Sequence, residues 1–334
     1  MKRIAILGGG SWGTALAIVL SRAHQQHEIS LWVHDEALAA TIRRERVNDA
    51  YLPGHFLADG VRVTHDPAEA LHRADLLVGA VPAAHARSVY RRILPYLVRG
   101  TPIVSATKGL EPESHARISE VVTQVVSPKF APRIAVLSGP SFAAEAAAAH
   151  PTAVVIASSD AELAAAVQEA LAGPNFRLYT NDDLLGVELA GAMKNVIAIA
   201  AGACQGLGLG ANTLAALITR GLAEMTRLAV ALGAQHKTLS GLAGLGDLVL
   251  TCTGALSRNR HVGFELGRGR SLSEILKGMR MVAEGVGTAP ALLAVARETG
   301  TELPITEQVT AILRDGKAPA EALRSIMDRP LKPE

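Results

Sequence analysis

Aromatic residues are scarce in this chain of 334 residues: they make up 3% of the sequence, while apolar residues reach 49%. Its interior must therefore be built from alanine, leucine, valine and isoleucine, which suits closely packed helices and parallel strands. The length is long for a single core and fits two domains of about 150 residues each. A net charge of only +2 argues against a nucleic-acid binder, which needs a concentrated basic face.

Cysteine is scarce as well, because Cys204 and Cys252 are the only two and they lie far apart in the sequence. We expect two reduced, buried thiols, with neither a disulfide nor a bound metal. No run approaches the about 18 uninterrupted apolar residues of a membrane span. The apolar run at the N-terminus is too brief for a secretory signal, because glycines interrupt it at once. A cytoplasmic protein with no integral membrane segment is therefore expected.

Short apolar runs alternate with helical patterns in the first half of the chain, and they are bounded by Gly, Pro and Asp. Strands are predicted at 4–7, 29–33, 76–81, 102–106, 134–138 and 153–157, and helices at 14–22 and 36–46. After about residue 184 only helical patterns remain, at 185–203, 213–232, 262–267, 271–277, 289–299 and 306–313. The sequence thus predicts an α/β Rossmann-type doubly wound parallel sheet domain over residues 1–184, followed by an all-α domain over residues 185–334.

A glycine-rich turn with the spacing GxGxxG follows the first predicted strand and opens a helix. In such a turn Gly8 permits the tight bend, Gly10 lets the backbone approach a pyrophosphate, and Gly13 lets the helix pack closely. The N-terminus of the helix then offers free N–H groups to the phosphates. The motif predicts dinucleotide binding, and the alternative is a glycine-rich turn that packs without a ligand.

The end of the second predicted strand is where an acidic residue usually binds the ribose of NAD. Here His34 occupies that position, and Asp35 comes one residue later. A histidine tolerates a 2′-phosphate, so NADP use is compatible with the sequence. The alternative is that His34 is a solvated loop residue.

One lysine and one asparagine interrupt a nearly apolar helical segment, 190–200. A lysine on an apolar helix must extend to solvent, find a partner or lose its proton. Lys194 is therefore a candidate general acid or base, and a lysine that extends to solvent is the alternative. Asp247, in a glycine-rich apolar loop, is a candidate partner for it.

Cationic and polar residues that suit a phosphorylated ligand gather in three other segments. Arg258 lies in the segment Ser257-Arg258-Asn259-Arg260 at a predicted helix start, where it can clamp a phosphate. Two further segments, 105–110 and 138–142, follow strands whose carboxyl ends face the ligand crevice of an open parallel sheet. They place Lys108, Gly139 and Ser141 to meet a ligand.

These motifs together resemble bacterial NAD(P)-dependent glycerol-3-phosphate dehydrogenase over essentially the whole chain. The motifs are GGGSWGTALA, ATKGLE, SGPSFAAE, GAMKNVIAIAAG, GLAGLGDLVLTCT, SRNR and PITE. One alone would be weak, but all seven in this order are highly specific. Two departures are minor, namely GGG where GAG is commoner and Ala283 between Val282 and Glu284.

The resemblance implies roles for individual residues. Lys194 is the expected proton donor and acceptor, with Asp247 beside it and Asn195 and Thr251 as second contacts. The expected substrate contacts are Lys108, Gly139, Ser141, Lys194, Asp247, Ser257, Arg258 and Asn259. The expected dinucleotide contacts are Gly8, Gly10, Ser11, Trp12, Gly13, His34, Lys108, Ala143, Arg258, Val282 and Glu284.

The function implied is the interconversion of dihydroxyacetone phosphate and sn-glycerol 3-phosphate with NADPH/NADP or NADH/NAD, which supplies glycerol 3-phosphate for phospholipid synthesis. A homodimer is expected from the resemblance. Two alternatives remain: a reductase of the 3-hydroxyacid dehydrogenase type, which also places lysine and asparagine on a long helix, and a non-catalytic dinucleotide sensor.

Overall fold

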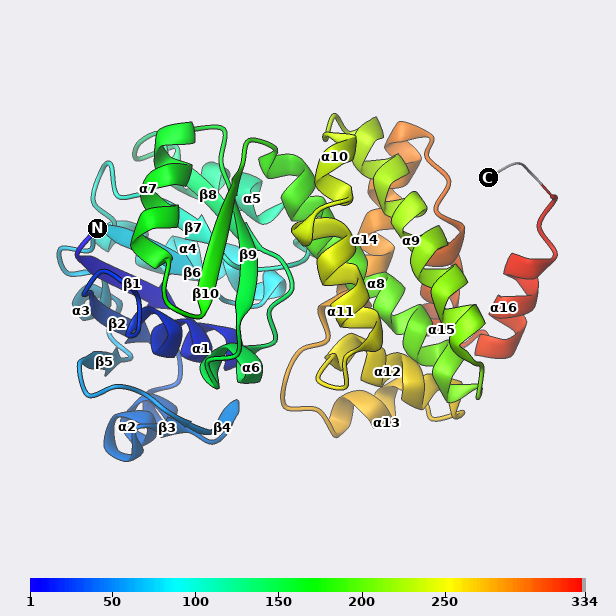
Figure 1. Cartoon of the computed structure of the whole chain (residues 1–334), viewed down its shortest axis with the longest axis horizontal. Coiled ribbons are helices and arrows are strands. Elements are labelled where there is room, and N and C mark those ends of the chain that lie inside the picture. Colours follow the sequence, from blue (N-terminus) through cyan, green and yellow to red (C-terminus); the bar gives the residue numbers. More distant parts are fainter. Residues whose placement is uncertain (332–334) are drawn as a thin grey trace. The chain divides into compact units, whose positions relative to one another are not determined.

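The computed structural model describes residues 1–331, and the last residues of the predicted helical domain, 332–334, lie outside the described residues. The chain divides into two compact units (Figure 1). The first comprises Met1–Glu111 and Ala116–Glu188, and the second comprises Pro112–His115 and Leu189–Glu334. The division falls inside helix α8 (Leu184–Gly206), so it does not decide the predicted boundary after residue 184.

The first unit is built on an eight-stranded sheet in the order β10-β9-β8-β7-β6-β1-β2-β5. Its strands are β1 (Arg3–Leu7), β2 (Glu28–Trp32), β5 (Val61–Thr64), β6 (Leu76–Gly79), β7 (Ile103–Ser105), β8 (Ile134–Ser138), β9 (Thr152–Ala157) and β10 (Phe176–Asn181). The strands β5, β2, β1, β6, β7 and β8 pair in parallel. Their carboxyl ends therefore lie at one edge of the sheet. The predicted Rossmann-type fold is confirmed.

The prediction that all strands run in parallel is wrong at one position, because β9 pairs antiparallel with β8. The helix between them, α6 (Ala143–Ala147), has five residues, and at about 1.5 Å per residue it is too short to carry the chain back along the sheet. The 11-residue helix α7 (Ala161–Leu171) is long enough, and β10 pairs in parallel with β9.

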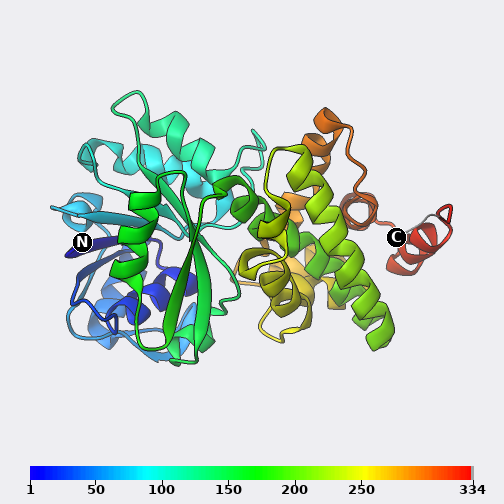
Figure 2. The same cartoon turned by 45° about the horizontal axis from the view of Figure 1, so that its top comes forward.

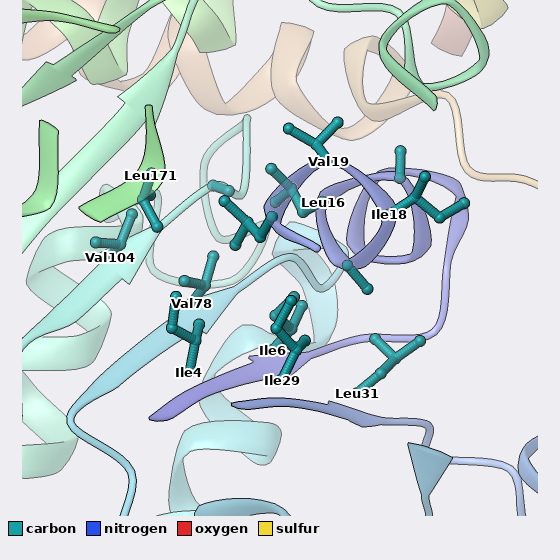
Figure 3. Close-up of a cluster of buried hydrophobic side chains, with 14 of the residues drawn as sticks. Ile4, Ile6, Leu16, Ile18, Val19, Ile29, Leu31, Val78, Val104 and Leu171 are labelled. Atoms are coloured by element: carbon teal, nitrogen blue, oxygen red, sulfur yellow. The ribbon is translucent and has the colours of Figure 1, made fainter. Parts of the chain in front are cut away.

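Alternate residues of β1 enter two separate cores, one on each face of the sheet. Ile4 and Ile6 belong to a buried cluster that includes Leu16 of α1 (Ser11–Leu20; Figure 3), whereas Ala5 and Leu7 belong to a second cluster with residues of α4 (Ala86–Ile93). Helices therefore cover both faces, as predicted. The other helices of this unit are α1 (Ser11–Leu20), α2 (Glu36–Glu45), α3 (Pro67–Leu71), α4 (Ala86–Ile93) and α5 (Ile118–Val126), and a small hairpin is formed by β3 (Val47–Asn48) and β4 (Leu52–Phe56).

Helices are the only regular secondary structure in the described residues of the second unit (Figure 2). After α8 its helices are α9 (Ala211–Ala231), α10 (His236–Leu239), α11 (Asp247–Thr253), α12 (Arg258–Gly267), α13 (Leu272–Lys277), α14 (Glu284–Thr299), α15 (Pro304–Arg314) and α16 (Pro319–Met327). Residues 242–246 form a π-helical turn before α11. Helix α8 is the only single described helix long and apolar enough to cross a membrane, and 83% of its apolar window is buried inside the protein, as in the core helix of a helical domain.

Candidate active site

The turn after β1 contains the three motif glycines, and each has a different environment. Gly8 has φ of +116°, a region that favours glycine, and an added Cβ would lie 2.5 Å from the carbonyl oxygen of Ala80. A Cβ on Gly13 would overlap the Gly8 carbonyl oxygen, whereas a Cβ on Gly10 would have no neighbour within 4 Å. The turn is therefore tight at its ends and open at Gly10, which suits the approach of a pyrophosphate.

The start of α1 also has features that suit a phosphate group. Gly10 is the N-cap and Ser11 the first helical residue, so the N–H groups of the first turn point away from the helix. The indole Nε1 of Trp12 is buried and has no hydrogen-bond partner among the described residues. Because a buried N–H donor rarely stays unsatisfied, this atom fits a bound acceptor. The residues present thus fit a dinucleotide.

Asn48 is a residue of this region that the sequence analysis missed. It is fully buried, and its Nδ2 atom donates to the Gly9 carbonyl oxygen and to Thr14 Oγ1, both at 2.8 Å. It therefore links the glycine turn to α1. In the sequence Asn48 is a single asparagine before Asp49, in no recognisable motif. Nothing in the sequence therefore predicts its contact with Gly9, 39 residues away.

His34 and Asp35 follow the end of β2, and both are exposed. Asp35 is the N-cap of α2, and its Oδ1 atom accepts from the Leu38 backbone N–H at 2.7 Å. One carboxylate oxygen of Asp35 is thus already hydrogen-bonded to the backbone of α2. His34 is the exposed side chain directly after β2, at the position where the sequence predicts the ribose contact.

Lys108, Gly139 and Ser141 come together at the carboxyl ends of β7 and β8. The Lys108 Nζ atom donates to the Gly139 carbonyl oxygen at 2.9 Å, and the Ser141 hydroxyl donates to the same oxygen at 3.0 Å. Gly139 has φ of +128°, and a Cβ there would lie 3.0 Å from Val154 Cα in β9. Ala143, another predicted residue, begins α6 and packs against the core of the first unit.

Lys194 lies on α8 with an exposed fraction of 5%, and its amino group is hydrogen-bonded to residues of α11. Its Nζ atom donates to Asp247 Oδ1 at 2.5 Å and to Thr251 Oγ1 at 2.9 Å. Thr251 in turn donates to the Asp247 backbone carbonyl oxygen at 2.6 Å. The exposed fraction of Asp247 is 1%, so the ion pair is buried. This arrangement excludes the alternative in which Lys194 extends to solvent.

The glycine-rich loop before Asp247 explains where that carboxylate lies. A Cβ on Gly244 would overlap the backbone of Leu239 at the end of α10, so the π-helical turn can pack there only with glycine. Asp247 then occupies the first position of α11, with Thr251 one helical turn later on the same face. The spacing Asp-x-x-x-Thr therefore presents both oxygens to the lysine.

Helices α8 and α12 of the second unit pack so closely that their backbones are in contact. A Cβ on Gly202 of α8 would overlap the Arg260 carbonyl oxygen, and a Cβ on Gly263 of α12 would overlap the Ile199 carbonyl oxygen. The small residues set the distance between the helix that carries Lys194 and the helix that follows Ser257.

Asn195 and Asn259 join three helices by a short hydrogen-bond chain. The Asn259 Nδ2 atom donates to Asn195 Oδ1 at 2.9 Å, and the Gly285 backbone N–H donates to Asn259 Oδ1 at 2.9 Å. Gly285 lies in α14, where a Cβ would be 2.7 Å from the Asn195 carbonyl oxygen. In the structure Asn259 thus contacts Asn195, the residue next to Lys194, and holds the start of α14.

Three predicted dinucleotide contacts, Arg258, Val282 and Glu284, lie together in the second unit. The Arg258 Nη1 atom donates to the Val282 carbonyl oxygen at 2.8 Å. Burial lowers the pKa of the Arg258 guanidinium from its usual value, and the Glu284 carboxylate opposes this change. Arginine nevertheless stays charged at neutral pH. Ser257 is the N-cap of α12, and its hydroxyl accepts from the Arg260 backbone N–H at 3.2 Å.

Both cysteines are free thiols, as predicted, and both lie in the second unit. Burial raises the pKa of Cys252 to about 12, although the neighbouring Lys194 opposes this change. Cys252 is therefore a protonated core residue and not a nucleophile. Among residues 1–331 no three His, Cys, Asp or Glu side chains are grouped to hold a metal ion.

Known proteins resemble this chain over nearly its whole length. Residues 3–164 match the N-terminal part of NAD-dependent glycerol-3-phosphate dehydrogenase, and residues 183–324 match its C-terminal part. A glycerol-3-phosphate dehydrogenase (NAD(P)+) of Koribacter versatilis is 52% identical over 331 residues, which cover 99% of this chain and 98% of the relative. One of Nitratidesulfovibrio vulgaris is 51% identical over 332 residues, covering 99% of this chain and 100% of the relative.

A solved structure supports the same relationship. The crystal structure of glycerol-3-phosphate dehydrogenase from Coxiella burnetii is 40% identical to this chain, with a TM-score of 0.93. The match covers 98% of this chain and 99% of that chain. Sequence and fold therefore agree over both units, and the chain belongs to the NAD-dependent glycerol-3-phosphate dehydrogenase family.

Proposed function

We propose that this chain interconverts dihydroxyacetone phosphate and sn-glycerol 3-phosphate with NADH or NADPH. The observation that carries this proposal is the buried Lys194, held by Asp247 and Thr251, in a chain of the glycerol-3-phosphate dehydrogenase family. The relatives at 50–52% identity are named for that activity, and the matches cover 98–99% of their length. Family membership also argues against a 3-hydroxyacid dehydrogenase. The buried pair of Lys194 and Asp247 argues against a non-catalytic dinucleotide sensor.

Lys194 is the proposed proton donor in the reducing direction. When bound, the reduced nicotinamide supplies a hydride to the ketone carbon of dihydroxyacetone phosphate. Negative charge then develops on the carbonyl oxygen, where the Lys194 ammonium stabilises it and delivers a proton. Asp247 and Thr251 hold the Nζ atom in one place before the reaction, so little reorganisation is needed. In the oxidising direction Lys194 accepts the proton of the substrate hydroxyl.

The phosphate of the substrate is proposed to bind cationic and polar side chains. Arg258 is half-buried, and an ion pair with a desolvated guanidinium is stronger than one in water. Lys108 lies at the carboxyl edge of the sheet, where ligands bind in this fold. The full proposed substrate set is Lys108, Gly139, Ser141, Lys194, Asp247, Ser257, Arg258 and Asn259.

The dinucleotide is proposed to bind along the glycine turn of the first unit. The open space at Gly10 and the unsatisfied Nε1 atom of Trp12 support this assignment. The full proposed cofactor set is Gly8, Gly10, Ser11, Trp12, Gly13, His34, Lys108, Ala143, Arg258, Val282 and Glu284.

Three further assignments are proposed on family membership alone. The chain acts in the cytoplasm, it forms a homodimer, and its product glycerol 3-phosphate feeds phospholipid synthesis. We also propose that the domain boundary lies after residue 184, at the start of α8.

The proposed reaction is tested by following the absorbance of the reduced nicotinamide with the purified chain. Dihydroxyacetone phosphate should cause oxidation of NADH or NADPH, and a 3-oxoacid should not. Oxidation with the 3-oxoacid alone would support the alternative reductase. Binding of both nucleotides without oxidation by either substrate would support a sensor and refute the proposed activity.

A further inference from the structure

A cationic side chain outside every predicted site lies against His34. Arg92 belongs to α4, 58 residues further along the chain, and its Nη1 atom is 2.9 Å from His34 Nδ1. Both side chains are exposed at the carboxyl end of β2, and both lie in the first unit. A guanidinium therefore stands next to the residue at the ribose-facing position.

The position of Arg92 is supported by a rigid aromatic side chain. The Arg92 guanidinium carbon lies 5.4 Å from the ring centroid of Trp32, within the range of a cation–π interaction. Trp32 is fully buried, and its Nε1 atom donates to the His65 carbonyl oxygen at 2.9 Å. Its ring also meets the His34 ring edge-on at 5.8 Å. The Trp32 ring thus contacts both the Arg92 guanidinium and the His34 ring.

The hydrogen bond between the two side chains determines which donors remain at the surface. A guanidinium has donors only, so His34 Nδ1 must be the acceptor and the imidazole proton then lies on Nε2. His34 consequently presents an N–H at Nε2, and Arg92 has further N–H groups besides the one it gives to His34. Several donors around one positive charge match the oxygens of a phosphate group.

The acidic residues of this segment are engaged elsewhere. Asp35 accepts a hydrogen bond as the N-cap of α2, and Glu36 lies 3.6 Å from His65 Nε2. An NAD site needs a carboxylate for the ribose 2′-hydroxyl, whereas an NADP site needs a nearby arginine for the 2′-phosphate. The residues present match the second requirement.

On the basis of the dinucleotide binding proposed above, we propose that Arg92, together with His34, binds the 2′-phosphate of NADP(H) and makes the chain favour NADPH over NADH. Arg92 comes from the helix after β6 and not from the strand end itself. It is therefore a specificity-determining residue that the β2 sequence does not reveal. Its charge acts on the phosphate alone, because NADH carries a hydroxyl at that position.

The experiment compares Arg92→Ala with Arg91→Ala, which removes the same side chain from the preceding, exposed position of the same helix. Binding of 2′,5′-ADP and of 5′-AMP is measured by calorimetry at two salt concentrations, and NADPH and NADH binding by fluorescence. These probes require no turnover. Thermal unfolding of each variant serves as the folding control.

Arg92→Ala should weaken 2′,5′-ADP and NADPH about tenfold or more, which corresponds to the loss of one charge-assisted hydrogen bond. It should change 5′-AMP and NADH less than about twofold, and Arg91→Ala should change none of the four. The salt dependence of 2′,5′-ADP binding should also decrease in Arg92→Ala. Equal weakening of both members of each pair, or no change in either, would overturn the assignment. If the parent binds nucleotides but never oxidises them with dihydroxyacetone phosphate, the proposed reaction is wrong while this outcome remains decisive for Arg92.

Discussion

Replacement of Lys194 by alanine removes the proposed proton donor and its charge at once. General acid catalysis is worth about 10²–10⁴-fold, and the loss of one group that stabilises transition-state charge costs about 10²–10³-fold. Both effects reside in one ammonium, so they do not multiply fully. We therefore expect Lys194→Ala to lower turnover by at least about 10³-fold.

The same substitution also affects stability, because the partner carboxylate stays buried. Asp247 is 1% exposed and would lose the ammonium that pairs with its Oδ1 atom at 2.5 Å. Removing one member of a buried ion pair costs about 3–5 kcal/mol, a large part of the about 5–15 kcal/mol that stabilises a typical domain. The double variant Lys194→Ala with Asp247→Asn removes the unpaired charge. It should regain stability without regaining turnover.

The assay is single-turnover hydride transfer, followed by nicotinamide absorbance in stopped flow, with nucleotide binding measured by fluorescence on the same samples. Dinucleotide affinity should stay nearly unchanged, because the glycine turn lies in the first unit and Lys194 in the second. A folded Lys194→Ala protein that keeps more than about a tenth of the parental rate would refute the proton-donor role. Recovery of turnover in the double variant would show that the loss came from the unpaired carboxylate.

Four further outcomes follow from the same contacts. Arg258→Ala should lower kcat/KM for dihydroxyacetone phosphate at least about thirty-fold, since loss of a desolvated charge pair costs about 2–5 kcal/mol; an unchanged kcat/KM would contradict its phosphate role. His34→Asp should shift the ratio of kcat/KM values toward NADH, measured with both nucleotides side by side, and a shift toward NADPH would be evidence against the ribose position. Gly263→Ala should lower the free energy of unfolding in urea by about 1–3 kcal/mol or more, because its Cβ would overlap a backbone carbonyl of α8, whereas Gly287→Ala, with its nearest neighbour 3.9 Å away, should be neutral or stabilising. Cys252, whose pKa is raised to about 12, stays protonated below that pH, so an aromatic disulfide reagent at pH 8 should modify it only after unfolding; rapid modification of the native protein would show that the thiol is accessible.

Six strands of the sheet could be predicted because central strands, buried on both faces, appear in the sequence as apolar runs. The edge strands β5 and β10 were not predicted, since one face of each meets solvent and their residues alternate. The direction of β9 was predicted wrongly for a different reason. An apolar run has no direction, and only the short connection through α6 reverses it.

For the candidate site, too, some features could be predicted from the sequence and others could not. GxGxxG after a strand and a lysine in an apolar helix are local patterns, so the sequence alone pointed to a dinucleotide turn and to Lys194. The sequence left open whether Lys194 extends to solvent or finds a partner. The contacts with Asp247 and Thr251, 53 and 57 residues further along the chain, decide this question in favour of a partner.

The sequence by itself determined the order of elements, the glycine turn and the family, because periodicity, spacing and motif order are properties of neighbouring residues. Only the tertiary structure decided that Asn48 holds the glycine turn, that Asn259 links Asn195 to α14, and that Arg92 lies against His34. Each of these polar side chains meets a partner at least 39 residues away. The sequence around a polar residue does not identify its partner. The two are brought together by the packing of helices against the sheet, or of helices against each other where glycine allows backbone contact.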